Sequence, residues 1–285
     1  MTDIQLADDS IISRRRFSRI FLIGIGIVAL HILIALLTLV WTPYDPNAMA
    51  GGRLEPPSIL HLIGTDRLGR DFLTLIMIGS RIALTVGIGA VIIGGVIGIV
   101  LGLLCGFASK TLDDALAATL DIMIAFPTLL LAMLIVTASD GASLWTAIVA
   151  IGIANSAIVA RLTRILTKRV LNMDFITASR VSGTSWAGVI VHHILPNIWP
   201  TLLVNLALQF GLAIITEASL SYLGLGAPPP NASWGRLLQE AQGTVYTAPL
   251  GAVAPGIALV SLVIAINIVA DELRDLADPI RRRRS

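Results

Sequence analysis

The stretch IALTVGIGAVIIGGVIGIVLGLLCGFAS occupies residues 82–109 and contains no charged side chain. A helix that crosses a hydrocarbon layer of about 30 Å needs about 20 apolar residues. Glycines recur at every fourth position from Gly94 through Gly98 and Gly102 to Gly106, so they share one helical face. A face of this kind lets another helix approach closely. The stretch therefore predicts a membrane-spanning helix that packs within this chain, with a surface facing another subunit as the alternative.

Other uncharged runs of similar length lie on both sides of this stretch. They cover residues 20–41, 122–139, 141–160, 198–216 and 250–270. Barrel strands would alternate over segments of about ten residues, whereas these runs are continuous. The sequence therefore predicts an all-α polytopic membrane protein with six transmembrane helices.

The composition supports the same class of protein. Of the 285 residues, 55% are hydrophobic and 13% are charged, and the mean hydropathy is +0.86. Soluble proteins carry about 25% charged residues. These values exclude a disordered chain, a coiled coil and an ordinary soluble enzyme. The single cysteine, Cys105, excludes a disulfide framework and a CxxC metal or redox site.

Lysine and arginine residues indicate the orientation in the membrane, because they concentrate in cytoplasmic segments. A cytoplasmic N-terminus places fifteen of them inside: Arg14, Arg15, Arg16, Arg19, Lys110, Arg161, Arg164, Lys168, Arg169, Arg180, Arg274 and Arg281–Arg284. Five then lie outside: Arg53, Arg67, Arg70, Arg81 and Arg236. Both termini are therefore predicted to be cytoplasmic. The net charge of +2 gives no reason to expect a nucleic-acid partner.

Motifs for catalysis or metal binding are not recognisable in the sequence. The segment from Gly106 to Thr111 lacks the glycine that precedes the lysine of a phosphate-binding loop and follows an apolar run. His192 and His193 are adjacent and have no third ligand nearby in sequence. We therefore predict no enzymatic activity, no ATPase site and no cofactor in this chain. If it moves a solute uphill, another subunit must supply the energy and must bind the basic loop 161–197.

Three polar residues within the spans are candidates for a translocation path or an outer gate. They are Asn205, Gln209 and Glu217. A charge at the bilayer centre costs about 2.5–3.5 kcal/mol on insertion scales, so Glu217 is expected to face a cavity or to lie near the outer rim. A structural hydrogen bond to a neighbouring loop is the alternative for Glu217.

The loop 161–197 contains a recognisable pattern of residues. Thr177-Ala178-Ser179 is followed after three residues by Gly183, and after nine more by His193-Ile194-Leu195-Pro196. This resembles the EAA loop of ABC-importer permeases, which reads Glu-Ala-Ala, three residues, Gly, nine residues, Ile-x-Leu-Pro. The resemblance implies a short coupling helix that docks on an ATP-binding subunit. Thr177 replaces Glu, Ser179 replaces Ala and His193 replaces Ile, so a salt bridge made by that glutamate is in doubt.

Further motifs narrow the resemblance. Residues 64–71 read GTDRLGRD, residues 217–226 read EASLSYLGLG, and Ser233-Trp234-Gly235 follows a run of prolines. Together with AFP at residues 125–127 and with DELRD and DP near the C-terminus, they are similar to the C-type permease of dipeptide, oligopeptide and nickel importers. Permeases of this type are inner-membrane components of binding-protein-dependent transport systems. The matching order runs from about residue 20 to residue 279.

The resemblance implies a type I ABC-importer transmembrane fold in a bacterial inner membrane. It also implies a second, B-type permease, two ATP-binding subunits that hold ATP and magnesium, and an extracytoplasmic substrate-binding protein. Dipeptides or oligopeptides are the first expected cargo, and nickel or other peptide-like solutes come second. An ion-coupled secondary carrier or channel subunit is the alternative function.

The expected organisation has three parts. Residues 1–80 hold a tail, the first span and an outer loop. Residues 81–271 form the permease domain, with the coupling loop at about 164–197. Residues 272–285 form a cytoplasmic tail.

Overall fold

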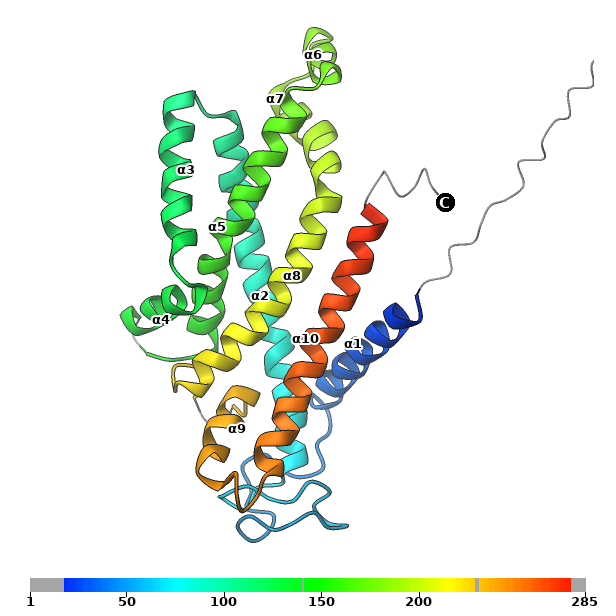
Figure 1. Cartoon of the computed structure of the whole chain (residues 1–285), viewed down its shortest axis with the longest axis vertical. Coiled ribbons are helices and arrows are strands. Elements are labelled where there is room, and N and C mark those ends of the chain that lie inside the picture. The colour runs from blue at the N-terminus through cyan, green and yellow to red at the C-terminus, as the bar shows by residue number, and fades with distance from the viewer. Residues whose placement is uncertain (1–17, 140, 229–230, 278–285) are drawn as a thin grey trace, which may run out of the picture.

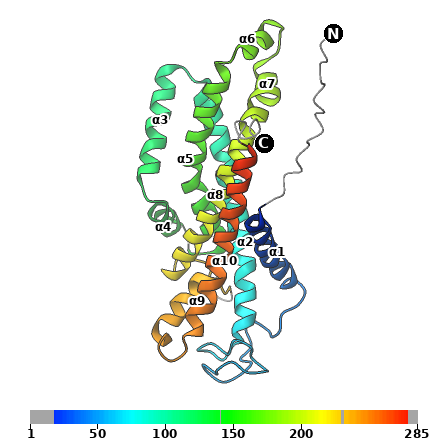
Figure 2. The same cartoon turned by 45° about the vertical axis from the view of Figure 1, so that its right-hand side comes forward.

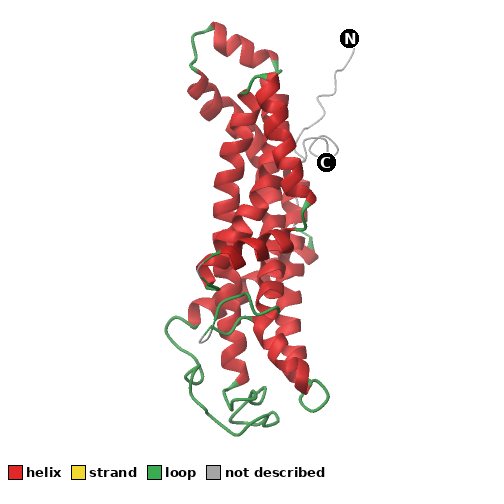
Figure 3. Cartoon of the chain, turned by 90° about the vertical axis from the view of Figure 1, so that its left-hand side faces the viewer, coloured by secondary structure: helices red, strands yellow, loops and turns green. Residues whose placement is uncertain are grey.

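The computed structural model describes residues 18–139, 141–228 and 231–277, which form an elongated bundle of helices (Figure 1). Within these ranges no strand forms, apart from an isolated bridge between Thr65 and Asp71. Figure 3, coloured by secondary structure, shows the same helical content from the side. The all-α prediction is confirmed for the described residues. The arginines at 14–16 and 281–284, Asp140, Pro229, Pro230 and the DP pair lie outside them.

The helices follow one another along the chain with short connections. Their bounds are α1 Arg19–Leu37, α2 Phe72–Phe107, α3 Lys110–Ala125, α4 Thr128–Ala138, α5 Leu144–Leu171, α6 Asp174–Val181, α7 Trp186–Val189, α8 Leu195–Tyr222, α9 Trp234–Ala241 and α10 Leu250–Ala277. A π-helical turn, η1 (Ile190–Ile194), joins α7 to α8, and a short 3₁₀ turn, η2 (Gln242–Thr244), follows α9.

The two ends of the bundle differ (Figures 1 and 2). The loop 38–71 and α9 lie at one end, and α6 and α7 project at the other. We call these the outer end and the inner end, following the predicted topology. The candidate membrane spans are α1, α2, α5, the continuous helix Trp186–Tyr222, and α10.

The third predicted span requires a correction. Residues 122–139 do not form one straight helix, because α3 and α4 meet at a bend of 93°. Pro127 disfavours helical backbone at the preceding residue, and Phe126 accordingly has φ −78° and ψ 131°. The pair α3 and α4 counts as a sixth span only if both arms are taken together. In Figure 1, α4 lies across the direction of α3.

Two predicted loop boundaries are also wrong. The outer loop was expected to reach residue 80, but α2 begins at Phe72 because the side chain of Asp71 accepts a hydrogen bond from the Thr74 amide. The inner loop was expected to begin at residue 161, but α5 continues to Leu171. Basic residues in the last turn of α5 favour this extension, since the C-terminus of a helix attracts cations.

Pro196 lies inside a helix and does not stop it. The helix from Trp186 to Tyr222 passes through it without a break. The π-helical turn η1 lies directly before Pro196, and Pro196 itself stands in the first turn of α8. The π-helical turn shifts the hydrogen-bonding pattern directly before the proline, where the Leu195 amide bonds to the Ile190 carbonyl oxygen, and so accommodates a residue without an amide hydrogen.

The glycine face of α2 packs against α5, as the intramolecular interpretation predicts. A Cβ at Gly98 would lie 2.5 Å from Val159 Cβ, and one at Gly102 would lie 2.4 Å from Thr163 Cβ. No side chain larger than hydrogen fits at this separation. The contact brings α2 and α5 together along most of their shared length.

Of three apolar clusters of buried residues in the described part of the chain, the two largest organise the bundle. The larger one joins α2, α5, α8 and α10 and includes the buried indole of Trp234 at the outer end. The smaller one lies at the inner end and includes Ile176 of α6 together with Ile194 and Ile198. Each end of the molecule therefore has its own packed core.

Candidate functional site

α6 is a short amphipathic helix at the inner end. Asp174 lies in its first turn and Arg180 in its last turn, an arrangement that the helix dipole favours. Ile176 is 3% exposed and anchors α6 in the inner apolar cluster. The chain leaves the helix through Gly183, whose φ of +87° lies in the left-handed region. α6 is therefore a fixed element rather than a loose loop.

The residues predicted for the coupling loop fall at three places. Thr177, Ala178 and Ser179 lie on α6, Gly183 lies in the turn after it, and His193, Leu195 and Pro196 lie where η1 passes into α8. Thr177 and Ala178 are exposed. Val181, which the pattern does not include, is 84% exposed on the same helix. The inner end therefore presents a short helix with small and apolar side chains on its surface.

Two of the departures from the EAA pattern contact each other. Ser179 Oγ lies 3.0 Å from His193 Nε2 and 2.9 Å from Thr184 Oγ1. The ring of Phe175 packs edge-on against His193, with 6.0 Å between the ring centroids. These contacts tie α6 to η1. A Ser and a His at these two positions thus form a hydrogen bond that Ala and Ile could not make.

Three side chains that the sequence analysis did not select form a second link. The guanidinium carbon of Arg180 lies 4.3 Å from the ring centroid of Trp186. Trp186 in turn meets Phe107, the last residue of α2, at 5.4 Å and 78°. A tryptophan in a short turn six residues after an arginine is the only sequence signal for this stack.

Glu217 lies near the outer end of α8 and is 2% exposed. Its Oε1 accepts a hydrogen bond from Ser221 Oγ at 2.6 Å, and its carboxylate also bonds Ser233, just before α9. The alternative interpretation, a bond to a neighbouring loop, matches this geometry. The carboxylate links α8 to the segment that carries Trp234.

Asn205 and Gln209 lie one turn apart on α8. Asn205 Oδ1 and Gln209 Oε1 are buried, and neither has a hydrogen-bond partner within the described residues. Both amide atoms of Asn155 on α5 are in the same condition. Buried polar atoms without partners are costly, so these side chains need water or solute to satisfy them. The structure does not bring Glu217 into contact with them.

The GTDRLGRD motif forms a compact, hydrogen-bonded turn directly before α2. Asp66 Oδ1 accepts from the amides of Leu68 and Arg70, both at 2.8 Å, and Asp66 Oδ2 accepts from Arg70 Nε at 2.6 Å. Gly64 and Gly69 have φ of +88° and +76°, which explains why the motif needs glycine there. Arg70 also reaches Glu240 of α9 at 3.4 Å. The motif therefore fixes the outer loop to α9.

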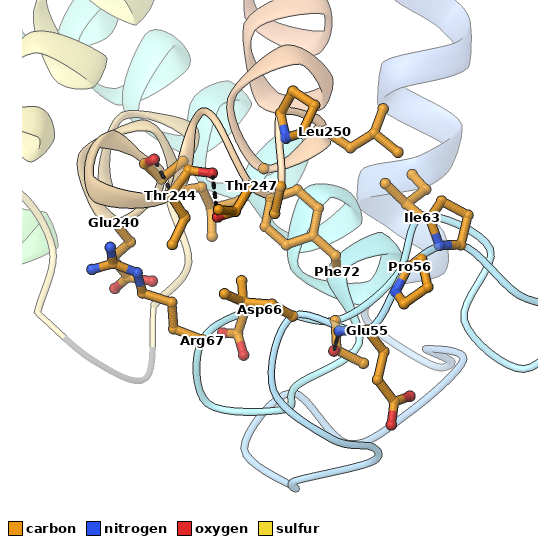
Figure 4. A pocket seen from close by; sticks show the side chains of 18 residues that line it. Glu55, Pro56, Ile63, Asp66, Arg67, Phe72, Glu240, Thr244, Thr247 and Leu250 are labelled. Carbon is orange, nitrogen blue, oxygen red and sulfur yellow. Dashed lines mark hydrogen bonds between the residues drawn. The ribbon is translucent and has the colours of Figure 1, made fainter.

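A cavity of about 230 Å³ lies between the turn formed by the GTDRLGRD motif and the connection from α9 to α10 (Figure 4). Phe72 and Leu250 contribute apolar lining, while Arg67 and Glu240 lie on its polar side. Ligand pockets usually hold about 300–1,000 Å³. We assign no ligand to this smaller cavity.

Comparison with known proteins places this geometry in a family. Residues 98–283 match the family described as the binding-protein-dependent transport system inner membrane component, which covers more than half of the chain. The chain belongs to this family. The comparisons indicate an ABC-importer permease subunit, since the homologues are transport permease subunits, and they imply a bacterial inner membrane.

Curated relatives match this permease over most of its length. The dipeptide transport system permease protein DppC of Alkalihalophilus pseudofirmus is 37% identical over 263 residues, covering 92% of this chain and 86% of that protein. The glutathione transport system permease protein GsiD of Pectobacterium atrosepticum is 39% identical, covering 88% and 84%. The nickel transport system permease protein NikC of Escherichia coli is 36% identical, covering 89% and 91%.

A solved structure has the same fold. The permease resembles a chain of the inward-facing MetNI methionine ABC transporter with a TM-score of 0.61 at 20% identity. The match covers 72% of this permease and 97% of that chain. The predicted type I ABC-importer fold is therefore confirmed.

Proposed function

We propose that this permease forms one half of the translocation path of an ATP-driven importer and that α6 docks on a separate ATP-binding subunit. The observation that carries the proposal is that α6 is exposed on one side and attached to the rest of the protein on the other. Thr177, Ala178 and Val181 are exposed, whereas Ile176 is buried and Ser179 is hydrogen-bonded to His193. A docking element must be accessible on one side and firmly attached on the other, and α6 meets both conditions.

The proposed complex holds four further subunits. A B-type permease completes the path, two ATP-binding subunits hold ATP with magnesium, and an extracytoplasmic binding protein delivers the solute. Family membership supports the general arrangement. The missing glutamate at Thr177 removes one ionic contact from the docking surface, so small-residue packing and Val181 carry the binding instead.

Peptides are the proposed cargo. Names of the relatives cover dipeptides, glutathione and nickel, and two of these three solutes are peptide-like. Asn205 and Gln209 are the proposed polar lining of the path, and Glu217 is the proposed residue of its outer gate; because the two amide oxygens are buried here, the path must open before cargo reaches them. Amide oxygens can accept hydrogen bonds from the N–H groups of a peptide.

The test is extraction of the tagged permease from its native membrane in mild detergent. We expect a second permease and ATP-binding subunits to co-purify and the eluate to hydrolyse ATP. Mass spectrometry of the solute carried by the associated binding protein then identifies the cargo. A lone chain without ATP hydrolysis, after gentle extraction and crosslinking, would favour an ion-coupled carrier or channel instead.

A matched pair of variants tests the docking surface. Val181→Glu introduces a charge on the exposed side of α6, and we expect recovery of the ATP-binding subunits to fall about ten-fold, equivalent to about 1.4 kcal/mol of binding. Tyr246→Glu makes a similar change at a side chain that is 99% exposed at the outer end, and recovery should not change. Equal recovery with both variants would show that α6 is not the docking site.

A further inference from the structure

We propose that Trp186 is a positioning residue that transmits movement of α6 to the inner end of α2, through the stack Arg180–Trp186–Phe107. This inference rests on the proposed docking of α6. It concerns a different question, namely which membrane helix receives the movement and through which side chain.

The connection between α6 and α2 runs through Trp186. Its indole contacts Arg180 of α6 on its face, at 4.3 Å from the ring centroid, and Phe107 of α2 in a T-shaped pair. Arg180 is itself held, because its Nη1 donates to the carbonyl oxygen of Thr184 at 2.5 Å. The stack therefore has a fixed end on α6 and a fixed end on α2.

Trp186 stands at the inner end of the continuous helix that runs into α8, so the stack joins α6 and α2 at the start of this helix. Ser185 caps α7 by accepting a hydrogen bond from the Gly188 amide, which sets Trp186 as the first residue of that helix. The indole is 48% exposed, so it is not simply core filling. The contacts of Ser179 and Phe175 with His193 connect α6 to α8 by a separate route.

α2 is a suitable receiver for this movement. It runs unbroken from Phe72 at the outer end to Phe107 at the inner end, and its glycine face is locked against α5. A shift applied at Phe107 therefore acts on a rigid pair of helices. Cation–π and aromatic pairs of this kind change an equilibrium by about two-fold to ten-fold, which is enough to bias a two-state transition.

The test uses hydrogen exchange of the assembled transporter in lipid nanodiscs, with and without MgATP and orthovanadate. In the wild type we expect MgATP to change the exchange of peptides from α6 (residues 174–185) and from the inner third of α2 (residues 99–109). In Trp186→Leu the response of α6 should persist, whereas the response of α2 should fall about five-fold. Trp186→Phe, which keeps an aromatic ring, should restore most of it.

Trp199→Leu is the matched control. Trp199 is 45% exposed on α8, close to the value for Trp186, and it makes no ring contact among the described residues. Its replacement should leave both responses unchanged. If Trp186→Leu does not assemble, Arg180→Gln removes the cation without removing the indole and should reduce the α2 response in the same direction.

The outcomes separate the two proposals. An α6 segment whose exchange MgATP and orthovanadate do not alter in the wild type would contradict the docking of α6. An α6 response with no α2 response in the wild type, or with an undiminished α2 response in Trp186→Leu, would overturn the role of Trp186 and leave the docking intact.

Discussion

At the scale of single residues, glycines set how closely α2 approaches α5. Gly102 faces Thr163 so tightly that an added Cβ would lie 2.4 Å from Thr163 Cβ and 2.6 Å from the Ala160 carbonyl oxygen. At Gly26 of α1, by contrast, an added Cβ would meet nothing within 4 Å. These two positions therefore allow the same substitution to be compared in two environments.

We predict that Gly102→Ala destabilises the permease by about 1–3 kcal/mol, because one extra methyl group overpacks the α2–α5 contact. Gly26→Ala should cost nothing measurable. Cys105 is 1% exposed, so a thiol-reactive fluorophore will label it only as the protein unfolds, and the melting midpoint of each variant can be read from that signal. Equal midpoints for the two variants would contradict the close contact.

The Ser179–His193 pair gives a second prediction at this scale. Each of Ser179→Ala and His193→Ile breaks the 3.0 Å hydrogen bond, at a net cost of about 0.5–1.5 kcal/mol. The double variant carries the Ala and Ile of the EAA pattern, and its loss should be smaller than the sum of the two single losses. Thermal melting of all four proteins in one double-mutant cycle measures the difference. Additive losses would show that the two side chains do not interact.

At the scale of elements, two carboxylates attach α3 to α5: Asp121 forms an exposed ion pair with Arg161 at 3.1 Å, and Asp113 forms the buried one. Asp113 is 3% exposed and accepts two hydrogen bonds from Arg164, at 2.6 and 2.8 Å, and a further one from Lys168. Asp113 is therefore the central anion between two cations of α5. Because Lys168 is 39% exposed, water screens part of this attraction.

We predict that Asp113→Asn loosens α3 and lowers stability by roughly 1–3 kcal/mol, because two cations lose their common partner. Asp114→Asn removes the same charge from the exposed neighbouring position and serves as the control. Limited proteolysis should then cleave the connection between α2 and α3 faster in Asp113→Asn alone. Identical cleavage rates in the two variants would contradict the anchoring role.

At the scale of the whole molecule, the orientation predicted from Lys and Arg places α6 inside and α9 outside. Val181 and Tyr246 are the reporters, at 84% and 99% exposure near opposite ends of the bundle. In intact spheroplasts, a membrane-impermeant maleimide should label Tyr246→Cys at once and Val181→Cys only after permeabilisation. Buried Cys105 can stay in place, and the wild type gives the background. The reverse labelling pattern would invert the topology.

The fold was largely predictable because apolar runs of about 20 residues have few alternatives in a membrane. The errors lie where local chemistry overrides hydropathy. Asp71 starts α2 earlier than the charged loop suggests, and Pro127 divides a run that is uniformly apolar. Hydropathy measures only how readily a residue enters lipid, so it cannot detect a helix cap or a bend.

The coupling loop was predictable as a pattern but not as a set of contacts. The resemblance to the EAA pattern implies a short helix in this loop, and α6 lies there, whereas the pairing of Ser179 with His193 depends on the turn at Gly183 that brings them together. Trp186 was missed because its partners come from positions 79 residues upstream and six residues upstream, and no local pattern records both. Contacts between distant segments need the folded chain.

The π-helical turn at Ile190–Ile194 has a consequence for the angular phase of the long helix. One residue advances an α-helix by about 100°, so adding or removing one residue here would rotate everything before the turn by that angle relative to α8. Trp186 would then point away from Phe107 while Asn205 and Gln209 kept their places. The length of this single turn therefore fixes the angle between the face of the helix that carries Trp186 and the face that carries Asn205 and Gln209 deeper in the membrane.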